Sequence, residues 1–356
     1  MDELWRRSAG ELAAMIREGE TTSAQVVDAH LGRIDEVNGA LNAVVHVMAD
    51  DARAEAAAVD DAIASGVEVG PLAGVPFTIK QNIDVAGLPT TLGIAALADA
   101  TAPVDAPVVE RMKAAGAVPL ARTNLPDLGL RIHTDGELHG LTRNPWHPGR
   151  TAGGSSGGEA ASLATGMSPI GLGNDLGGSL RNPASCCSIA SIKPTVGRVP
   201  AAYTYPAPDA SLTEQLFAVE GPMARTVADV RLGLSILAGW HVRDPLSVPM
   251  PLDGPGPGVR RVAVMAAPPA GDTDPRIADA TRRAATALEA AGCQVEEVDA
   301  PRYEEVVEVW SGLVLGGIHL ALPLLEPILS TPSIEFLRLA EGIVEPPTLD
   351  SMGLHW

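Results

Sequence analysis

The sequence predicts an α/β fold with a mixed, largely parallel central sheet that helices cover on both faces. Two stretches carry this prediction because each alternates helical and strand patterns. Residues 106–115 have a helical pattern that stops at Gly116 and leads into a buried strand pattern at 117–121. Residues 259–298 repeat the order strand, helix and strand. Such alternation favours a mostly parallel sheet between covering helices.

The remaining elements are predicted in chain order from local signals. Thr22 and Gln25 form a capping box ahead of apolar residues spaced by about 3.6 positions, which predicts an amphipathic outer helix. β-Branched residues indicate a strand over 42–47, and an alanine-rich run indicates a helix over 50–64. The further predicted elements are a strand at 77–80, a helix at 156–165, a strand at 170–173 and a helix at 226–237.

Composition places the chain among globular proteins. Of its 356 residues 46% are hydrophobic, and no run of about 18 apolar residues occurs, so we expect no membrane span. The first residues lack a basic stretch that leads into an apolar run, which predicts no secretory signal and makes the cytoplasm the expected location. The net charge of −19 argues against a nucleic-acid surface, because neutralising phosphates requires clustered lysines and arginines.

The cysteines and histidines predict no metal or redox site. Cys186 and Cys187 are adjacent and Cys293 stands alone, a set that fits neither a disulfide framework nor a Cys-x-x-Cys motif. The 8 histidines form no recognised metal-binding pattern. We therefore expect reduced, buried thiols, no metal and no organic cofactor.

Two clusters of glycine and serine are the candidates for chemistry. One is GGSSGG at 153–158 and the other is DLGGSLR at 175–181. Glycine permits close approach of the backbone, and exposed N–H groups there can surround an oxygen with developing negative charge. A phosphate loop would need a Lys-Ser/Thr ending, a dinucleotide fingerprint would need glycine in place of Leu176, and a hydrolase elbow would need Gly-x-Ser-x-Gly. None of these is present, which leaves a flexible loop or a serine nucleophile.

These clusters resemble the amidase signature family of Ser-Ser-Lys hydrolases. The resemblance consists of GGSSGGE from Gly153, D-x-GGS-x-R-x-P from Asp175 and KPT-x-GR from Lys193. Its spacing is specific. Shorter blocks that look like the family's occur at 74–80, 123–124, 144–145 and 221–229.

The resemblance implies the amidase signature fold as a single amidase domain over residues 1–356. It covers roughly residues 20–300, which carry the recognisable family core. Family members typically continue beyond the point where this chain stops, so 301–356 is expected to be an incomplete or variable C-terminal segment. A truncated and inactive family member is therefore one interpretation that the sequence leaves open.

The resemblance assigns catalytic roles to three residues. Ser179 is the nucleophile, Ser155 is the bridging serine that follows a cis peptide bond with Gly154, and Lys80 is the ultimate base. A free lysine has a pKa of about 10.4, so Lys80 must be buried, away from carboxylates that hold its charge, to accept a proton near neutral pH. The family usually has an acid after this lysine, whereas Gln81 stands here.

The resemblance also implies supporting groups around the nucleophile. The oxyanion hole is expected from four backbone N–H groups, those of Leu176, Gly177, Gly178 and Ser179. Ser156 is either a helix N-cap or a donor to the catalytic hydroxyls. Asp175 and Arg181 are expected to pair and hold the turn. Cys187 is a second candidate nucleophile, although the family commonly has an unused cysteine there.

The activity implied is hydrolysis of a non-peptide carboxamide to a carboxylate and ammonia or an amine through a Ser179 acyl-enzyme. The expected partner is a small-molecule amide, without nucleic acid or membrane, and a homodimer is one expectation for assembly. An alternative is a glutamine-hydrolysing protein that resembles the A-type component of the tRNA-dependent amidotransferase and passes ammonia to companion chains. A glutaminase assay without partners separates the two.

Overall fold

The computed structural model describes residues 3–204, 212–254 and 260–341. The chain forms two compact units, Met1–Met250 with Ala321–Gly342 and Pro251–Leu320 with Ile343–Trp356. Each unit is built around its own sheet, and the first contains all the predicted site residues.

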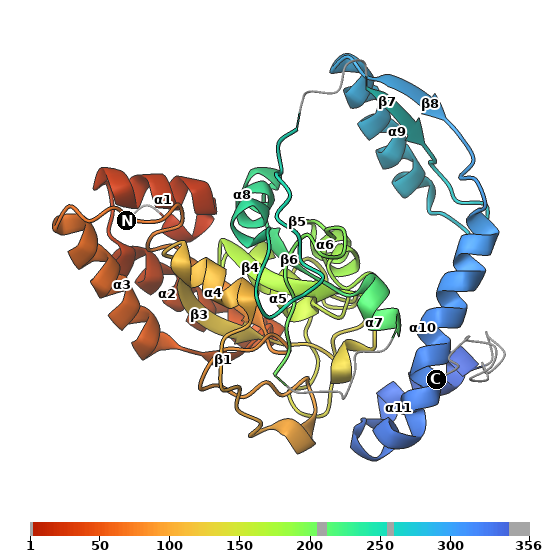
Figure 1. Cartoon of the computed structure of the whole chain (residues 1–356), viewed down its shortest axis with the longest axis horizontal. Coiled ribbons are helices and arrows are strands. Elements are labelled where there is room, and N and C mark those ends of the chain that lie inside the picture. Colours follow the sequence, from red (N-terminus) through yellow and green to blue (C-terminus); the bar gives the residue numbers. More distant parts are fainter. Residues whose placement is uncertain (1–2, 205–211, 255–259, 342–356) are drawn as a thin grey trace. The chain divides into compact units, whose positions relative to one another are not determined.

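The first unit contains a six-stranded sheet in the order β1-β3-β2-β4-β6-β5 (Figure 1). The strands are β1 (Val44–Val47), β2 (Pro76–Lys80), β3 (Val118–Thr123), β4 (Ile170–Asp175), β5 (Ala190–Ser191) and β6 (Val219–Ala224). β2 pairs in parallel with β3 and β4, whereas β1 and β6 are antiparallel to their neighbours. Because β5 is antiparallel to β6, the strands β2, β3, β4 and β5 run in one direction. The predicted mixed, largely parallel sheet is confirmed.

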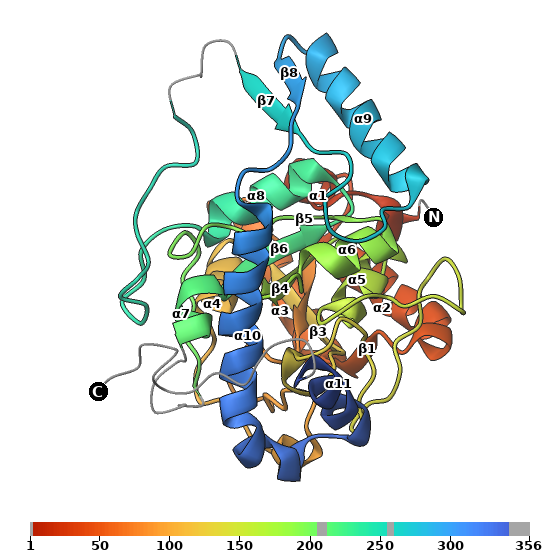
Figure 2. The same ribbon diagram turned by 90° about the vertical axis from the view of Figure 1, so that its right-hand side faces the viewer.

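Helices cover both faces of this sheet (Figure 2). They are α1 (Ala9–Glu18), α2 (Ser23–Leu41), α3 (Ala49–Ala64), α4 (Pro107–Ala114), α5 (Gly157–Ala164), α6 (Arg181–Cys187), α7 (Leu212–Phe217) and α8 (Val227–Leu237). Phe77 and Ile79 of β2 pack in a cluster with α1, α4 and α8, while Leu120 of β3 packs with α2, α3 and α5. Since successive side chains of a strand point to opposite faces, Thr78 and Lys80 point toward α5.

The helix starts follow from local capping. α2 begins at the predicted box, in which the Thr22 hydroxyl accepts from the Gln25 N–H and the Gln25 side chain accepts from the Thr22 N–H. α1 lies outside the predicted elements, although Ser8 and Glu11 form a box of the same type at its start. Short 3-10 helices occur at Leu4–Arg6, Ala95–Leu97, Asp127–Gly129 and Glu326–Ile328.

The second unit contains the predicted strand, helix and strand. β7 (Arg261–Val264) and β8 (Gln294–Glu297) pair in parallel, and α9 (Pro275–Ala290) connects them. Asp274 is the N-cap of α9, and its carboxylate accepts from the Arg276 N–H.

Two helices follow where the sequence patterns predict no named element. They are α10 (Tyr303–Leu325), which begins in the second unit, and α11 (Thr331–Glu341) in the first. Within the described ranges, no single helix is long and apolar enough to cross a membrane. One bent pair, residues 303–318 with 322–328, meets the length and composition criteria only when both helices are counted together.

Candidate active site

Lys80 ends β2 at the centre of the sheet and is completely buried. Its Nζ donates to Ser155 Oγ at 2.7 Å and to Asn174 Oδ1 at 2.6 Å. β2 lies between β3 and β4, so this amine lies at the carboxyl end of parallel strands, where α/β sheets place their ligand sites. The structure thus brings the predicted base and the predicted bridging serine into direct contact.

Burial lowers the pKa of Lys80 to about 7, because a low-dielectric environment disfavours the ammonium form. The carboxylates of Glu220, Asp175 and Glu159, in this order, oppose the effect. These acids influence the pKa of the amine, but the hydrogen bonds of Lys80 go to Ser155 and Asn174. Burial prevails because the amine donates its hydrogen bonds to neutral oxygens of a hydroxyl and an amide.

Ser155 lies behind a cis peptide bond, Gly154–Ser155, as the resemblance implied. A Cβ at position 154 would lie 2.5 Å from the Arg131 carbonyl oxygen, so a side chain does not fit before this bond. Gly129 has φ of +69°, and a Cβ there would lie 3.1 Å from Ser155 Oγ. Glycines on two segments therefore let the backbone enclose the Ser155 hydroxyl.

Ser179 lies in the bend between β4 and α6 and is partly exposed. Its carbonyl oxygen accepts from the Ser156 N–H at 3.3 Å, which joins the two glycine-serine clusters through their backbones. No hydrogen bond connects the hydroxyls of Ser155 and Ser179 in the described part of the chain. Of the predicted relay, the hydrogen bond between Lys80 and Ser155 is present. Among the residues that the structure describes, Ser179 is joined to the GGSSGG cluster only through its backbone carbonyl oxygen.

Asp175 holds the bend around Ser179. Its carboxylate forms two 2.9 Å bonds with Arg181, from Nε and from NH2, which confirms the predicted pair. It also accepts the N–H groups of Gly178 at 2.7 Å and Leu180 at 3.0 Å. Burial alone would raise the pKa of Asp175, but these hydrogen bonds and the Arg181 charge bring it below its ordinary value.

The four predicted oxyanion donors fall into two groups. The Gly178 N–H donates to Asp175, so it is not available to a developing oxyanion in this structure. For the N–H groups of Leu176, Gly177 and Ser179, the described residues provide no acceptor. Gly178 has φ of +127°, a conformation that glycine adopts readily, and it turns the chain so that its own N–H meets Asp175.

Ser156 occupies the N-cap position of α5, but its side chain makes no capping bond. Its hydroxyl donates to the Asn174 carbonyl oxygen at 3.5 Å. The first N–H of α5, that of Gly157, donates to Thr134 Oγ1 at 3.1 Å instead. Neither predicted use of the Ser156 hydroxyl is therefore present.

Two buried carboxylates near Lys80 were not among the predicted site residues. Glu159 of α5 accepts from the hydroxyls of Thr78 and Thr123, the latter at 2.7 Å, and burial raises its pKa to about 7. Glu220 of β6 has its pKa raised to about 7 for the same reason. A charged residue inside the apolar strand 219–224 is the sequence signal that could have pointed to Glu220.

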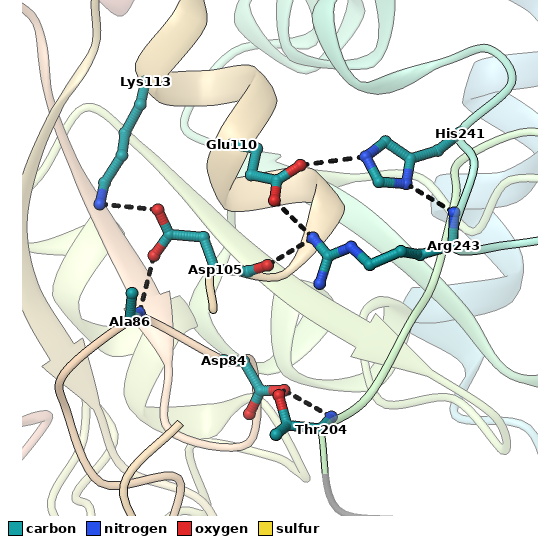
Figure 3. A network of polar contacts seen from close by, with 8 residues as sticks. All are labelled: Asp84, Ala86, Asp105, Glu110, Lys113, Thr204, His241 and Arg243. Carbon is teal, nitrogen blue, oxygen red and sulfur yellow. Dashed lines mark hydrogen bonds and ion pairs between the residues drawn. The ribbon is translucent and has the colours of Figure 1, made fainter. Parts of the chain in front are cut away.

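The segment after Lys80 is held by a polar network (Figure 3). Asp84 accepts from the Thr204 N–H at 2.8 Å and from its hydroxyl at 2.5 Å. Asp105 accepts from the Ala86 N–H at 2.8 Å and from Lys113 Nζ at 2.9 Å. The network continues through Glu110, His241 and Arg243. Asp84, the first acid after the lysine, thus anchors the segment ending at residue 204.

Cys187 is buried at the end of α6, and its Sγ donates to the Ala152 carbonyl oxygen at 3.4 Å. Burial raises the pKa of this thiol to about 12, so it carries no thiolate near neutral pH. Across the described residues, no group of three His, Cys, Asp or Glu side chains could hold a metal ion.

Comparison with known sequences gives one family. A family model described as Amidase matches residues 25–322. The chain is 46% identical over 312 residues to an indoleacetamide hydrolase of Bradyrhizobium diazoefficiens, covering 87% of this chain and 60% of that protein. It is 35% identical over 327 residues to an acylamidase of Rhodococcus erythropolis, covering 90% and 67%. It is also 37% identical over 302 residues to the A-type component of a glutamyl-tRNA(Gln) amidotransferase from Synechococcus sp. strain CC9605, covering 83% and 60%. The chain spans about 60% of the length of the first and third of these relatives.

Solved structures agree with this result. A bacterial aryl acylamidase described as an amidase signature enzyme has a TM-score of 0.83 at 30% identity, covering 98% of this chain and 74% of that one. The peptide amidase of Stenotrophomonas maltophilia has a TM-score of 0.76 at 29% identity, covering 94% and 72%.

Proposed function

Because the chain belongs to the amidase signature family, we propose that it is an amidase that hydrolyses a carboxamide to a carboxylate and ammonia or an amine. The observation that carries this proposal is the 2.7 Å hydrogen bond between Lys80 Nζ and Ser155 Oγ. The Lys80 amine is buried and has a pKa of about 7. Such an amine is available in its neutral form near pH 7 and can accept a proton through a hydroxyl.

In the acylation step, Ser179 Oγ forms a bond with the substrate carbonyl carbon, and the C=O π electrons move onto the oxygen. The Ser179 proton passes to Ser155 Oγ while the Ser155 proton passes to the Lys80 lone pair. This transfer requires a hydrogen bond between the Ser179 and Ser155 hydroxyls, which has to form when substrate binds. Catalytic hydrogen bonds are often long or misaligned before then.

The developing oxyanion is proposed to bind the N–H groups of Leu176, Gly177 and Ser179, which the described residues leave without an acceptor. Loss of one such donor typically costs roughly 3–4 kcal/mol of transition-state stabilisation. The hydrogen bond between Gly178 and Asp175 holds the bend that carries these three donors, so both residues position the oxyanion site.

Collapse of the intermediate breaks the C–N bond. The leaving nitrogen takes a proton from Ser155, which regains one from the Lys80 ammonium, and ammonia or an amine departs. Water then attacks the acyl-enzyme, giving its proton through the same relay, and the carboxylate leaves as Ser179 recovers its hydrogen. The proposed cycle uses only groups of this chain, the substrate and water.

The proposed substrate class is a small-molecule carboxamide, and a primary carboxamide, which releases ammonia, is the first candidate. The support is the 46% identity to an indoleacetamide hydrolase, against 37% for the amidotransferase component. The second candidate function is a glutamine-hydrolysing component of a larger assembly, which the similarity to amidotransferase relatives supports. A cytoplasmic location and a homodimer stay predictions, as does a single domain over 1–356.

The test is ammonia release by the purified chain from indoleacetamide and from glutamine, with a simple anilide assayed for aniline. We expect hydrolysis of indoleacetamide by the wild type and none by Ser179→Ala. Hydrolysis of glutamine alone would favour the amidotransferase candidate. No turnover of any amide would overturn the proposal and favour an inactive family member.

A further inference from the structure

Glu220 is a buried acid on β6, the strand that pairs with β4. It lies directly opposite Asn174 of β4, and only 3% of its surface is exposed. In the described part of the chain its Oε2 has no hydrogen-bond partner. Asn174 Oδ1 in turn accepts from Lys80 Nζ at 2.6 Å and from Asn82 at 3.3 Å. Asn174 therefore stands between the acid and the amine.

A purely structural role does not explain this arrangement. A buried carboxylate with an unpartnered oxygen is costly, and a well-packed apolar residue of similar volume is usually at least as stable. A structural ion pair would also bring the carboxylate onto the amine and hold the lysine as an ammonium. Here the amine donates to neutral oxygens and keeps its contact with Ser155.

We propose that Glu220 is a positioning residue for the Lys80 base, and that its negative charge stabilises the ammonium that forms in each proton transfer. This inference rests on the proposed function, because it takes Lys80 as the proton acceptor. A buried amine without a counter-charge stays neutral but is a weak base, and a general base works best when its pKa lies near the working pH. Burial raises the pKa of Glu220 to about 7, but the positive charge of Lys80 opposes this rise, so protonation of the amine favours the charged carboxylate. Because Asn174 lies between the two groups, Glu220 strengthens the base without displacing its contact with Ser155.

Other titratable groups also influence the pKa of Glu220 or of Lys80. They are Asp84 from the segment after β2, Glu159 from α5, Asp175 from β4 and Tyr203 from the segment before α7. Each of these acids has partners: Asp175 bonds with Arg181, Glu159 with two threonine hydroxyls and Asp84 with Thr204. Glu220 has side-chain hydrogen bonds with Asn174 and Tyr203, which leave its Oε2 unpartnered. Among the acids that raise the pKa of Lys80, Glu220 has the largest effect.

The direct test is the titration of Lys80 in the full chain by side-chain ¹⁵N NMR. The chain has only three lysines, so Lys113 and Lys193 serve as internal references. We expect Glu220→Gln to lower the pH at which Lys80 titrates and to leave both references unchanged. Glu159→Gln, a matched change of another buried acid, is expected to move Lys80 less.

An unchanged Lys80 titration in Glu220→Gln would overturn the proposal, as would an equal or larger shift in Glu159→Gln. If Glu220→Gln fails to fold, Glu220→Met removes the same charge with a side chain of similar volume and carries the same expectation. Because this titration needs no turnover, it tests Glu220 even if the amidase proposal fails.

The kinetic readout is the pH profile of kcat/KM. We expect Glu220→Gln to shift the acid limb to lower pH and to lower the plateau about tenfold, part of the roughly 10²- to 10⁴-fold that a positioned base contributes. Glu220→Asp, which keeps the charge, should restore the position of the acid limb. A uniform loss of rate with an unmoved acid limb would show a merely structural role and overturn the proposal.

Discussion

The backbone N–H of Ser156 donates to the carbonyl oxygen of Ser179 at 3.3 Å. This bond connects residues of the two glycine-serine clusters without using either catalytic hydroxyl. Removing the side-chain oxygen of Ser155 or of Ser179 therefore leaves the backbone contact in place. The two serines can be tested separately for chemistry.

Ser155→Ala is expected to lower kcat by roughly 10²- to 10⁴-fold, the range for a lost proton-transfer step, with little change in KM. The oxyanion donors and Ser179 remain, so a residual rate above that of Ser179→Ala is expected. Steady-state kinetics on a hydrolysed amide, with the Tm of each variant as a folding control, measures this. A wild-type rate in Ser155→Ala would contradict the relay.

The pKa of Lys80, about 7, predicts the pH dependence of activity. The neutral amine is the base, so kcat/KM should fall as the pH drops through about 7 and the amine gains a proton. A buffer-matched pH profile checks this. If the acid limb instead lay near the pKa of an ordinary carboxyl, about 4, a different group would be the base.

Gly171→Ala should destabilise the centre of the sheet. A Cβ at this position of β4 would lie 1.7 Å from Glu159 Oε1 and 2.8 Å from Thr78 Oγ1. Such overpacking typically costs about 1–3 kcal/mol in the free energy of unfolding. Gly32→Ala in α2 is the control, because a Cβ there meets nothing within 4 Å and should stabilise the helix by about 0.5–1 kcal/mol. Urea unfolding that ranks the two variants equally would contradict this packing.

Asp127→Ala should loosen α11. Asp127 Oδ2 accepts from the Ser330 N–H at 2.8 Å, from the Ser330 hydroxyl and from the Ser333 hydroxyl at 2.9 Å. Each buried donor left unpaired costs roughly 1–3 kcal/mol. Hydrogen exchange should therefore show faster exchange of the α11 amides in Asp127→Ala. Ser333→Ala removes one of these bonds and should have a smaller effect; equal protection in all three proteins would contradict the role of Asp127.

Much of the fold could be predicted because its signals are local. The Thr22 and Gln25 capping box, the helix stop at Gly116 and the strand that ends at Lys80 each lie within a few residues. β6 was not predicted, because Gly221 and Pro222 interrupt its strand pattern. Its place beside β4 is set by long-range pairing.

The same distinction applies to the site. Lys80 and Ser155 come from motifs 75 positions apart, and only the resemblance to a family connected them before the structure did. Glu220 reaches the lysine through its cross-strand neighbour Asn174, a register that no local pattern contains. The motif contains Gly178, but only the structure shows that its N–H donates to Asp175 and is not available to an oxyanion.

The most direct test of the central claim is labelling with a fluorophosphonate probe, which reacts with an activated serine. Wild type and Cys187→Ala, whose buried thiol takes no part, should be labelled at the same rate. Ser179→Ala should not be labelled, and Lys80→Ala should be labelled far more slowly, because the serine loses its base. Equal labelling of wild type, Ser179→Ala and Lys80→Ala would contradict a Ser179 nucleophile activated through Ser155 by Lys80.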